Sequence, residues 1–279
     1  MKIEFGFSPC PNDTFMFWAW VHDHLLSDLK IEPRLYDIQE LNRFALDQAL
    51  LPLTKVSMAT YLDPEIQSRY TLLQSGAALG RGCGPLVVSG KPWSLADPRP
   101  VRLAIPGRNT TACKLAEMAL GDWVEEWVEL RYDDIMPAVL AGTQVDAGVI
   151  IHESRFVYQE LGLSCALDLG HWWESQTGLP LPLGLMLARN DLDSESKAQV
   201  ETLLRDSIVL AQKTLALPPD HEHSRSLWRY LRDNAIELED RTLLSHIELY
   251  VNDFSVDLGA EGNAAIVAFR EKCTQRSSF

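Results

Sequence analysis

The sequence predicts an α/β fold of two lobes, with a central cleft and a hinge between them. Three observations lead to this prediction. Strands and helices alternate in two successive series, a proline-rich connector at 90–100 separates the series, and the pattern from Asp193 onward is helical. If the helical tail returns to the first lobe, the chain crosses between lobes near 90–100 and again near 185–190. The expected lobes are a larger discontinuous one of residues 1–92 and 187–279 and a smaller one of residues 93–186.

The first series opens with a strand and a capped helix. Lys2–Phe7 has the composition of a strand, and the polar residues 12–14 can cap a helix that carries the apolar run Phe15–Val21. Apolar residues recur at helical spacing in Ile38–Leu50. The other elements expected in this series are strands at 29–36, 54–57, 70–73 and 85–89 and a short helix at 58–61.

The second series repeats the alternation and ends in helices. The expected strands are 101–105, 128–132, 146–151 and 183–189. The expected helices are 109–120 and 134–140, followed by tail helices at 198–215, 224–234, 240–250 and 262–270. Such alternation predicts a largely parallel sheet with helices on both faces. The whole order resembles a type II periplasmic-binding-protein fold.

The composition excludes several classes of partner. The 279 residues carry a formal net charge of −14, which repels phosphate backbones and anionic lipid, so neither nucleic acid nor a membrane is an expected partner. The negative charge does not exclude a small anionic ligand, because helix dipoles and a few hydrogen-bond donors attract it locally. Five widely spaced cysteines fit neither a disulfide framework nor a Cys-x-x-Cys metal site. We therefore expect reduced thiols, a cytoplasmic location and no bound metal.

His152 is the first candidate for chemistry. Ligands of open α/β sheets bind beyond the carboxyl ends of strands, and the apolar run Ala147–Ile151 delivers His152 to such an end. An imidazole titrates near neutral pH and is therefore a natural general base. A lone histidine is more often structural, so the residues alone leave both interpretations open.

Two further strand ends carry polar residues. Asn109, Thr110 and Thr111 open a helix after the strand 101–105, and the positive end of that helix suits a carboxylate or phosphate. Simple helix capping explains the same residues equally well. In Thr54-Lys55-Val56-Ser57, Lys55 could neutralise an anion and Ser57 could cap the next helix, but this signal is weak by itself.

The sequence does not determine the roles of Cys10 and Arg81. A reactive thiol needs an adjacent base or a cationic environment, and the sequence shows neither beside Cys10, which we interpret as part of a rigid Pro9–Pro11 turn. Arg81, in a glycine-rich stretch, could reach an acidic ligand.

Seven segments, taken in chain order, carry a family pattern: FGFSPCPNDTFMF, LPLTKVS, ALGRGCGPLVVS, PGRNTTA, AGVIIHESRF, GLPLPLGLMLAR and YVNDFSVDLG. Together they resemble the 1,4-dihydroxy-6-naphthoate synthase family of the futalosine route to menaquinone. SPCPNDTF and IIHESRF are specific for this family, whereas TKVS alone would not identify it.

The resemblance implies a reaction and roles for residues. Members of the family convert cyclic dehypoxanthine futalosine to 1,4-dihydroxy-6-naphthoate, which is a carbon–carbon lyase step that needs no redox cofactor. The matching base is His152. The matching substrate contacts are Lys55, Val56, Ser57, Thr110 and Thr111, and the helix start at Asn109–Thr111 suits the substrate carboxylate.

Two alternatives remain at this point. The main alternative is a solute-binding protein or sensor, because a fold of this kind often only binds ligands without reacting with them. The second alternative is a related enzyme with dehydratase chemistry. His152 discriminates between a binding protein and the lyase, because a binding protein needs polar contacts but no base. The sequence does not fix the oligomeric state, and a homodimer is compatible with it.

Overall fold

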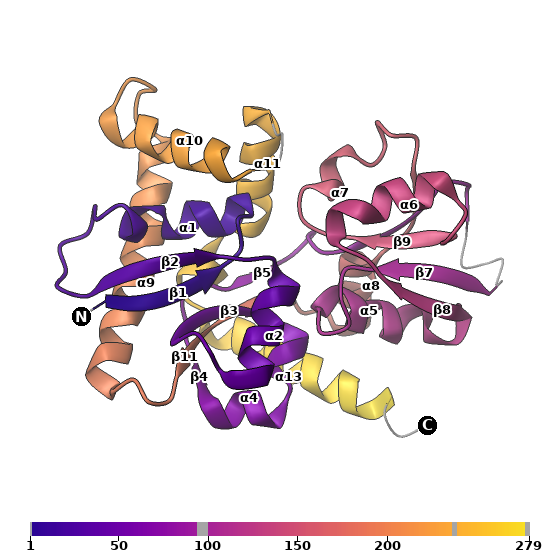
Figure 1. Ribbon diagram of the computed structural model, residues 1–279, viewed down its shortest axis with the longest axis horizontal. Helices are drawn as coiled ribbons and strands as arrows, with labels where there is room; N and C mark the ends of the chain where they lie inside the picture. The colour runs from indigo at the N-terminus through magenta and orange to yellow at the C-terminus, as the bar shows by residue number, and fades with distance from the viewer. Residues whose placement is uncertain (1, 94–99, 236–238, 277–279) are drawn as a thin grey trace.

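A computed structural model describes residues 2–93, 100–235 and 239–276 of the chain. It consists of two β-sheets, each with its own helices, that lie side by side (Figure 1). We call each sheet together with its helices a lobe. The α/β fold with two sheets that the sequence predicts is confirmed. Within the described ranges, no helix is both long and apolar enough to span a membrane.

The first lobe contains a six-stranded sheet. Its strand order is β2-β1-β3-β11-β4, and β5 also pairs with β11. The strands are β1 (Lys2–Phe7), β2 (Lys30–Leu35), β3 (Leu53–Ser57), β4 (Tyr70–Leu72), β5 (Ala78–Gly80) and β11 (Leu181–Arg189). β1 runs parallel to both β2 and β3, whereas β11 runs antiparallel to its three neighbours.

The second lobe contains a five-stranded sheet of order β10-β6-β9-β7-β8. Its strands are β6 (Leu86–Ser89), β7 (Val101–Ile105), β8 (Val124–Glu129), β9 (Ala147–Ile150) and β10 (Ser164–Asp168). β7 is parallel to β8 and β9, whereas β6 is antiparallel to β9 and β10. Among the described strands, all but β11 in the first sheet and all but β6 in the second point the same way, so the prediction of a largely parallel arrangement holds for strand direction, although both sheets are mixed. β6 and β11 each follow a passage between the lobes and enter their sheets in the opposite direction to the other strands.

The chain passes between the sheets at other places than the sequence suggests. It enters the second sheet between β5 and β6 and returns to the first just before β11. β6 and β7 flank the proline-rich connector and belong to the same sheet, so the chain does not pass between the lobes there. Residues 94–99 of the connector lie outside the described residues. The second predicted crossing, at 185–190, is also wrong, because these residues lie within and just after β11, where the chain has already returned to the first sheet. Prolines mark loops within a sheet and between sheets alike, so composition could not separate the two. We propose lobe boundaries at 81–85 and 178–180.

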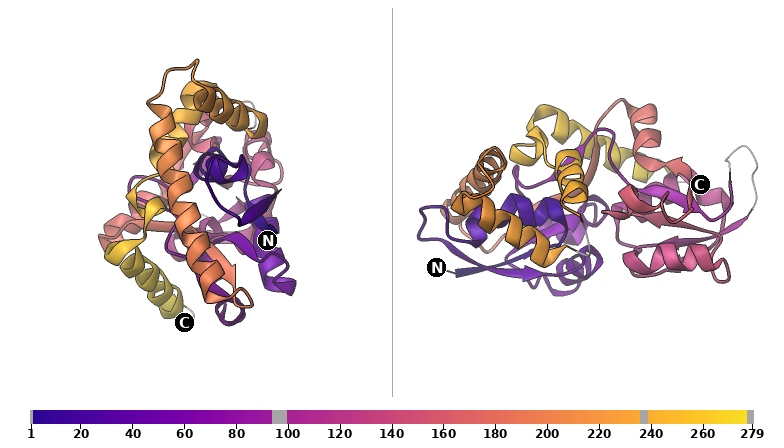
Figure 2. Two further views of the ribbon diagram at one scale, coloured as in Figure 1. Left: turned by 90° about the vertical axis from the view of Figure 1, so that its left-hand side faces the viewer. Right: turned by 90° about the horizontal axis from the view of Figure 1, so that it is seen from above.

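Helices cover the first sheet on both faces. α1 (Pro11–Val21) has a proline at its first position, where a helix tolerates it. Its residues 11–20 are all buried, as expected for a helix that is apolar on every side after its polar first turn. It packs in the main core of this lobe with β1 and with α9 (Ser194–Leu215), the long helix that crosses the lobe in Figures 1 and 2. The other helices are α2 (Ile38–Gln48), α3 (Met58–Tyr61), α4 (Pro64–Arg69), α10 (Glu222–Asn234), α11 (Asp240–Tyr250), α12 (Asp253–Val256) and α13 (Gly259–Arg276).

The second lobe carries α5 (Thr111–Leu120), α6 (Ile135–Ala141), α7 (Ser154–Val157) and α8 (Leu169–Thr177), with 3-10 turns at Gly121–Trp123 and Tyr132–Asp134. A buried cluster joins the lobes. In it, Phe269 of α13 contacts Trp173 of α8 with ring centroids 5.2 Å apart.

Local details differ from the predicted elements. The strand expected at 128–132 lies at 124–129, because β8 is an edge strand that can leave its three glutamates exposed or partly exposed to water. The sequence prediction also omitted α4, β5, β10, α8 and α12. β5 is only three residues long, and β10 is an edge strand with an irregular register, so both lack the period-2 pattern of a typical strand.

Candidate active site

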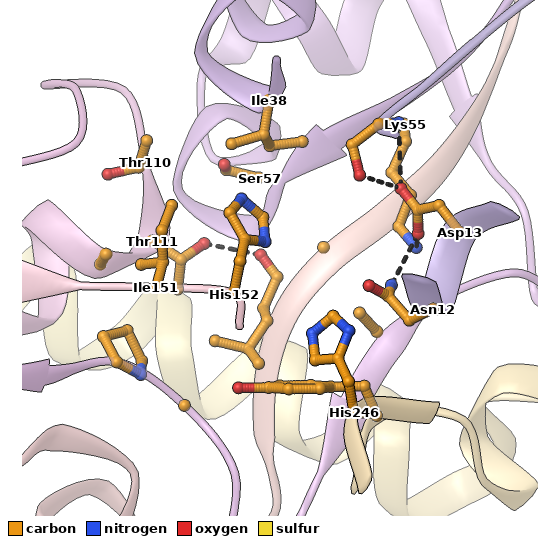
Figure 3. A pocket seen from close by; sticks show the side chains of 18 residues that line it. Asn12, Asp13, Ile38, Lys55, Ser57, Thr110, Thr111, Ile151, His152 and His246 are labelled. Atoms are coloured by element: carbon orange, nitrogen blue, oxygen red, sulfur yellow. Dashed lines mark hydrogen bonds and ion pairs between the residues drawn. The ribbon is translucent and has the colours of Figure 1, made fainter. Parts of the chain in front are cut away.

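A cavity of about 650 Å³, part of it open to solvent, lies between the two lobes (Figure 3). It forms where the carboxyl ends of β1, β3, β7 and β9 meet, which is where ligands of open α/β sheets bind. β11 and α11 complete its wall. The lining residues are Ser8, Asn12, Asp13, Ile38, Lys55, Ser57, Ala78, Gly84, Pro85, Thr110, Thr111, Ala112, Ile151, His152, Leu183, Gly184, His246 and Tyr250.

Asp13, in the first turn of α1, organises one side of this cavity. Its Oδ1 accepts hydrogen bonds from Lys55 Nζ at 2.5 Å and from Asn12 Nδ2 at 2.7 Å. Its Oδ2 accepts from the backbone N–H of Ser8 at 3.1 Å and from the Ser8 hydroxyl at 2.7 Å. The Lys55 and Asp13 side chains are only 3% and 2% exposed. The charge of Lys55 is thus already balanced inside the protein, which the sequence did not suggest.

Ser57, at the end of β3, is held by Asn42 of α2. The Ser57 N–H donates to Asn42 Oδ1 at 2.8 Å, and Asn42 Nδ2 donates to Ser57 Oγ at 3.0 Å. Asn42 Nδ2 also approaches the carbonyl of Asn109 at 3.3 Å, so one side chain connects both lobes. Val56, between Lys55 and Ser57, packs in a separate core cluster and is not among the lining residues.

The loop after β7 ends in the N-terminus of α5. Thr110 is the N-cap and accepts from the Cys113 N–H at 3.2 Å. Gly107 has φ +143°, and a Cβ there would lie 2.4 Å from Gln39 of the first lobe, so only glycine fits this close approach. The N–H groups of Thr111 and Ala112 lie in the first turn, where a helix offers them no carbonyl. This end of the cavity can therefore bind an anionic group.

Thr111 also links the lobes. Its hydroxyl donates to the carbonyl of Leu183 on β11 at 2.7 Å and accepts from the N–H of Ala59 at 3.3 Å. Asn109 does not line the cavity; its carbonyl instead accepts from Thr60 Oγ1 at 2.8 Å.

His152 follows β9 and has φ +56°, a left-handed conformation that is uncommon for a residue other than glycine. Its Nδ1 lies 3.0 Å from Cys10 Sγ, and the ring of Tyr132 packs against it edge-on with centroids 5.1 Å apart. Its Nε2 is buried and has no hydrogen-bond partner among the described residues. The ring is thus fixed at one nitrogen and free at the other, on a side chain that lines the cavity.

His246 and Tyr250, from α11, complete the cavity and were not expected there. His246 is 1% exposed, and its Nδ1 has no partner within the described part of the chain. Burial and the nearby His152 lower the pKa of His246 to about 3, so it is neutral at neutral pH. The sequence did hold a signal: His246 and Tyr250 share the buried face of α11 with Leu243 and Ile247, at helical spacing.

The structure therefore brings together Lys55, Ser57, Thr110, Thr111 and His152, but not the side chains of Val56 and Asn109. It also places a base beside Cys10, where the sequence showed none, because the two residues lie 142 positions apart. Burial and the nearby Glu153 raise the pKa of the Cys10 thiol, which disfavours a thiolate nucleophile. Arg81 pairs with Glu261 at 2.6 Å and is not among the lining residues.

Residues 3–275 match the family described as menaquinone biosynthesis. Two curated relatives, from Thermus thermophilus and Streptomyces coelicolor, are each named 1,4-dihydroxy-6-naphtoate synthase. The first is 46% identical over 95% of this chain and 91% of its own length, and the second is 38% identical over 95% and 90%. The family resemblance of the sequence segments is therefore confirmed.

Solved structures agree on the fold. A protein of Archaeoglobus fulgidus has a TM-score of 0.87 and 35% identity, covering 100% of this chain and 98% of its own. The periplasmic aliphatic sulphonate binding protein of Escherichia coli has a TM-score of 0.63 at 13% identity, covering 99% and 87%. The second likeness shows the fold alone, and it confirms the predicted periplasmic-binding-protein-like architecture.

Proposed function

The chain belongs to the menaquinone biosynthesis family, and we propose that it is a carbon–carbon lyase that converts cyclic dehypoxanthine futalosine to 1,4-dihydroxy-6-naphthoate. In this proposal the substrate occupies the cavity between the lobes and His152 is the general base. The observation that carries the proposal is the buried Nε2 of His152, which has no partner among the described residues although its side chain lines the cavity.

The base is assigned by comparing the two histidines of the cavity. A general base works best when its pKa lies near the operating pH. His246 does not meet this condition, because its pKa is lowered to about 3. His152 is held through Nδ1, which leaves Nε2 to take a proton from the substrate. The electron pair left by that proton forms a new double bond in the sugar-derived fragment as the carbon–carbon bond to it breaks. The pair of the broken bond stays with the ring system, the fragment leaves, and formation of the aromatic ring favours the products.

The substrate carboxylate is proposed to bind at the start of α5. There the N–H groups of Thr111 and Ala112 and the positive end of the helix are available, whereas Lys55 is already paired with Asp13. A negative overall charge does not oppose this, because the attraction is local. The proposed reaction is neither an oxidation nor a reduction, so it requires no redox cofactor. A cytoplasmic location and a homodimer remain predictions.

The conversion can be tested directly. The purified protein is incubated with cyclic dehypoxanthine futalosine, and dihydroxynaphthoate is sought by mass spectrometry, with His152→Asn as the inactive control. Product formed by the wild type and not by the variant supports the proposal. Saturable binding by the wild type without any product would instead favour a solute-binding protein or sensor of the same fold.

A further inference from the structure

We propose that Cys10 is a positioning residue for His152: its sulfur accepts the Nδ1–H and so keeps Nε2 as the unprotonated nitrogen in the cavity. This inference rests on the proposed function only in so far as His152 is the base. It assigns a role to a cysteine that the reaction itself does not use.

The contact is short, buried and made across the lobes. Cys10 ends the turn after β1 in the first lobe and is 6% exposed, whereas His152 follows β9 in the second lobe. Their Sγ and Nδ1 atoms are 3.0 Å apart, within hydrogen-bonding distance for sulfur. The left-handed backbone at His152 and the ring of Tyr132, which packs at a steep angle to the imidazole, restrict how the imidazole can turn.

The direction of this hydrogen bond follows from the proposed role of His152. A neutral imidazole carries one proton, on one of its two ring nitrogens. If Nε2 takes a proton from the substrate, the ring proton is on Nδ1, and Cys10 Sγ, 3.0 Å away, is the atom that accepts it.

The turn that carries Cys10 is itself held in place. Asp13 Oδ2 accepts from the Ser8 N–H at 3.1 Å and from the Ser8 hydroxyl at 2.7 Å, and its Oδ1 accepts from Lys55 and Asn12. These hydrogen bonds fix the turn on which Cys10 lies, so the sulfur contacts Nδ1 from a rigid part of the first lobe.

The tautomer can be measured without substrate. The protein is labelled with ¹⁵N-histidine, the His152 signals are assigned by their loss in His152→Asn, and long-range ¹H–¹⁵N spectra at a pH where the ring is neutral identify the protonated nitrogen. We expect Nδ1–H in the wild type and a shift toward Nε2–H in Cys10→Ala. Cys10→Ser, whose hydroxyl can accept and donate in the same way, should keep Nδ1–H. Predominant Nε2–H in the wild type would overturn the inference.

Kinetics provide the second measurement. Loss of one hydrogen bond to the base should lower kcat of Cys10→Ala by about 5- to 10-fold and leave KM within about two-fold, and Cys10→Ser should recover most of the loss. Cys113→Ala is the matched control, because Cys113 is likewise a buried cysteine but is not among the residues that line the cavity. Equal kcat values for Cys10→Ala and wild type would refute the positioning role.

The two proposals fail in different ways. A wild type that makes no dihydroxynaphthoate refutes the proposed function whatever the tautomer, and the spectra then still decide whether Cys10 orients His152. A wild type that turns over with Nε2–H refutes the inference alone.

Discussion

Two sides of the cavity differ in how completely their polar groups are paired. The carboxylate side consists of Ser8, Asn12, Asp13 and Lys55, and Asp13 alone accepts four hydrogen bonds there. The histidine side consists of His152 and His246, each with one buried ring nitrogen that has no partner in the described part of the protein. Buried polar groups are nearly always paired, and an unpaired one costs about 1–3 kcal/mol. The histidine side thus has the free groups that a ligand can use, and the carboxylate side supports it.

This difference leads to opposite expectations for mutations. A change on the histidine side should reduce activity and leave the fold intact. A change on the carboxylate side should first reduce the free energy of unfolding, because it leaves a buried charge without its partner.

The largest effect is expected for His152→Asn. Removal of a general base typically lowers turnover by about 10²–10⁴-fold. Asparagine is among the residues that best tolerate a left-handed backbone, so the φ of +56° at this position should not destabilise the variant. Steady-state kinetics and urea denaturation measure both effects. His171→Asn, at an exposed histidine of α8, is the control. Turnover near the wild-type value in His152→Asn would show that the base is another residue.

Lys55→Met tests the carboxylate side. It leaves Asp13 charged and buried without its cation, which should lower the free energy of unfolding by about 3–5 kcal/mol. Arg232→Met breaks the exposed pair with Asp240, whose side chains are 52% and 53% exposed, and should cost about 0–1 kcal/mol. Urea denaturation compares the two variants. Equal losses in both would mean that the buried pair does not support this side of the cavity.

His246→Phe should change how stability depends on pH. The pKa of His246 is lowered to about 3 in the folded protein from an ordinary value of 6.5. Below pH 6.5 the unfolded chain therefore binds a proton that the folded protein does not, and stability falls as the pH falls, by up to about 1.4 kcal/mol per pH unit.

Phenylalanine cannot bind this proton, and it can keep the edge-on packing of His246 against Tyr250. Between pH 6.5 and pH 4.5 the wild type should therefore lose about 2–3 kcal/mol more stability than His246→Phe. Urea denaturation at several pH values measures this difference, and His171→Asn should behave like the wild type. Parallel pH curves for wild type and His246→Phe would mean that His246 is protonated in the folded state.

Local chemistry explains which parts of the site could be predicted from the sequence. His152 and the loop that leads into α5 each come just after an apolar strand, so strand ends and helix caps were enough to locate them. The contact between Cys10 and His152, and the arrival of α11 at the cavity, depend on which strands become neighbours. Local patterns do not contain that information.

The same distinction holds for the lobes and for charge. The alternation of elements predicted two lobes, but the crossings were misplaced because a proline-rich loop has the same composition within a sheet as between sheets. From the sequence alone, Lys55 could neutralise an anionic ligand, whereas in the structure it is paired with Asp13. Its partner Asp13 had been interpreted only as a helix cap, and only the pairing of β1 with β3 brings their ends together.

The smallest effect is expected for Thr111→Ala, which tests the contact between the lobes. The Thr111 hydroxyl donates to Leu183 and accepts from Ala59, so its loss should cost about 1 kcal/mol of stability. Thr111 also lies at the start of α5, where the carboxylate of the substrate is proposed to bind. KM should therefore rise by about 3- to 10-fold while kcat stays within about two-fold. Thr111→Ser keeps the hydroxyl and should resemble the wild type in urea denaturation and in kinetics. A loss confined to kcat would place Thr111 in the chemical step instead, and the division between a supporting and a reacting side of the cavity would have to be redrawn.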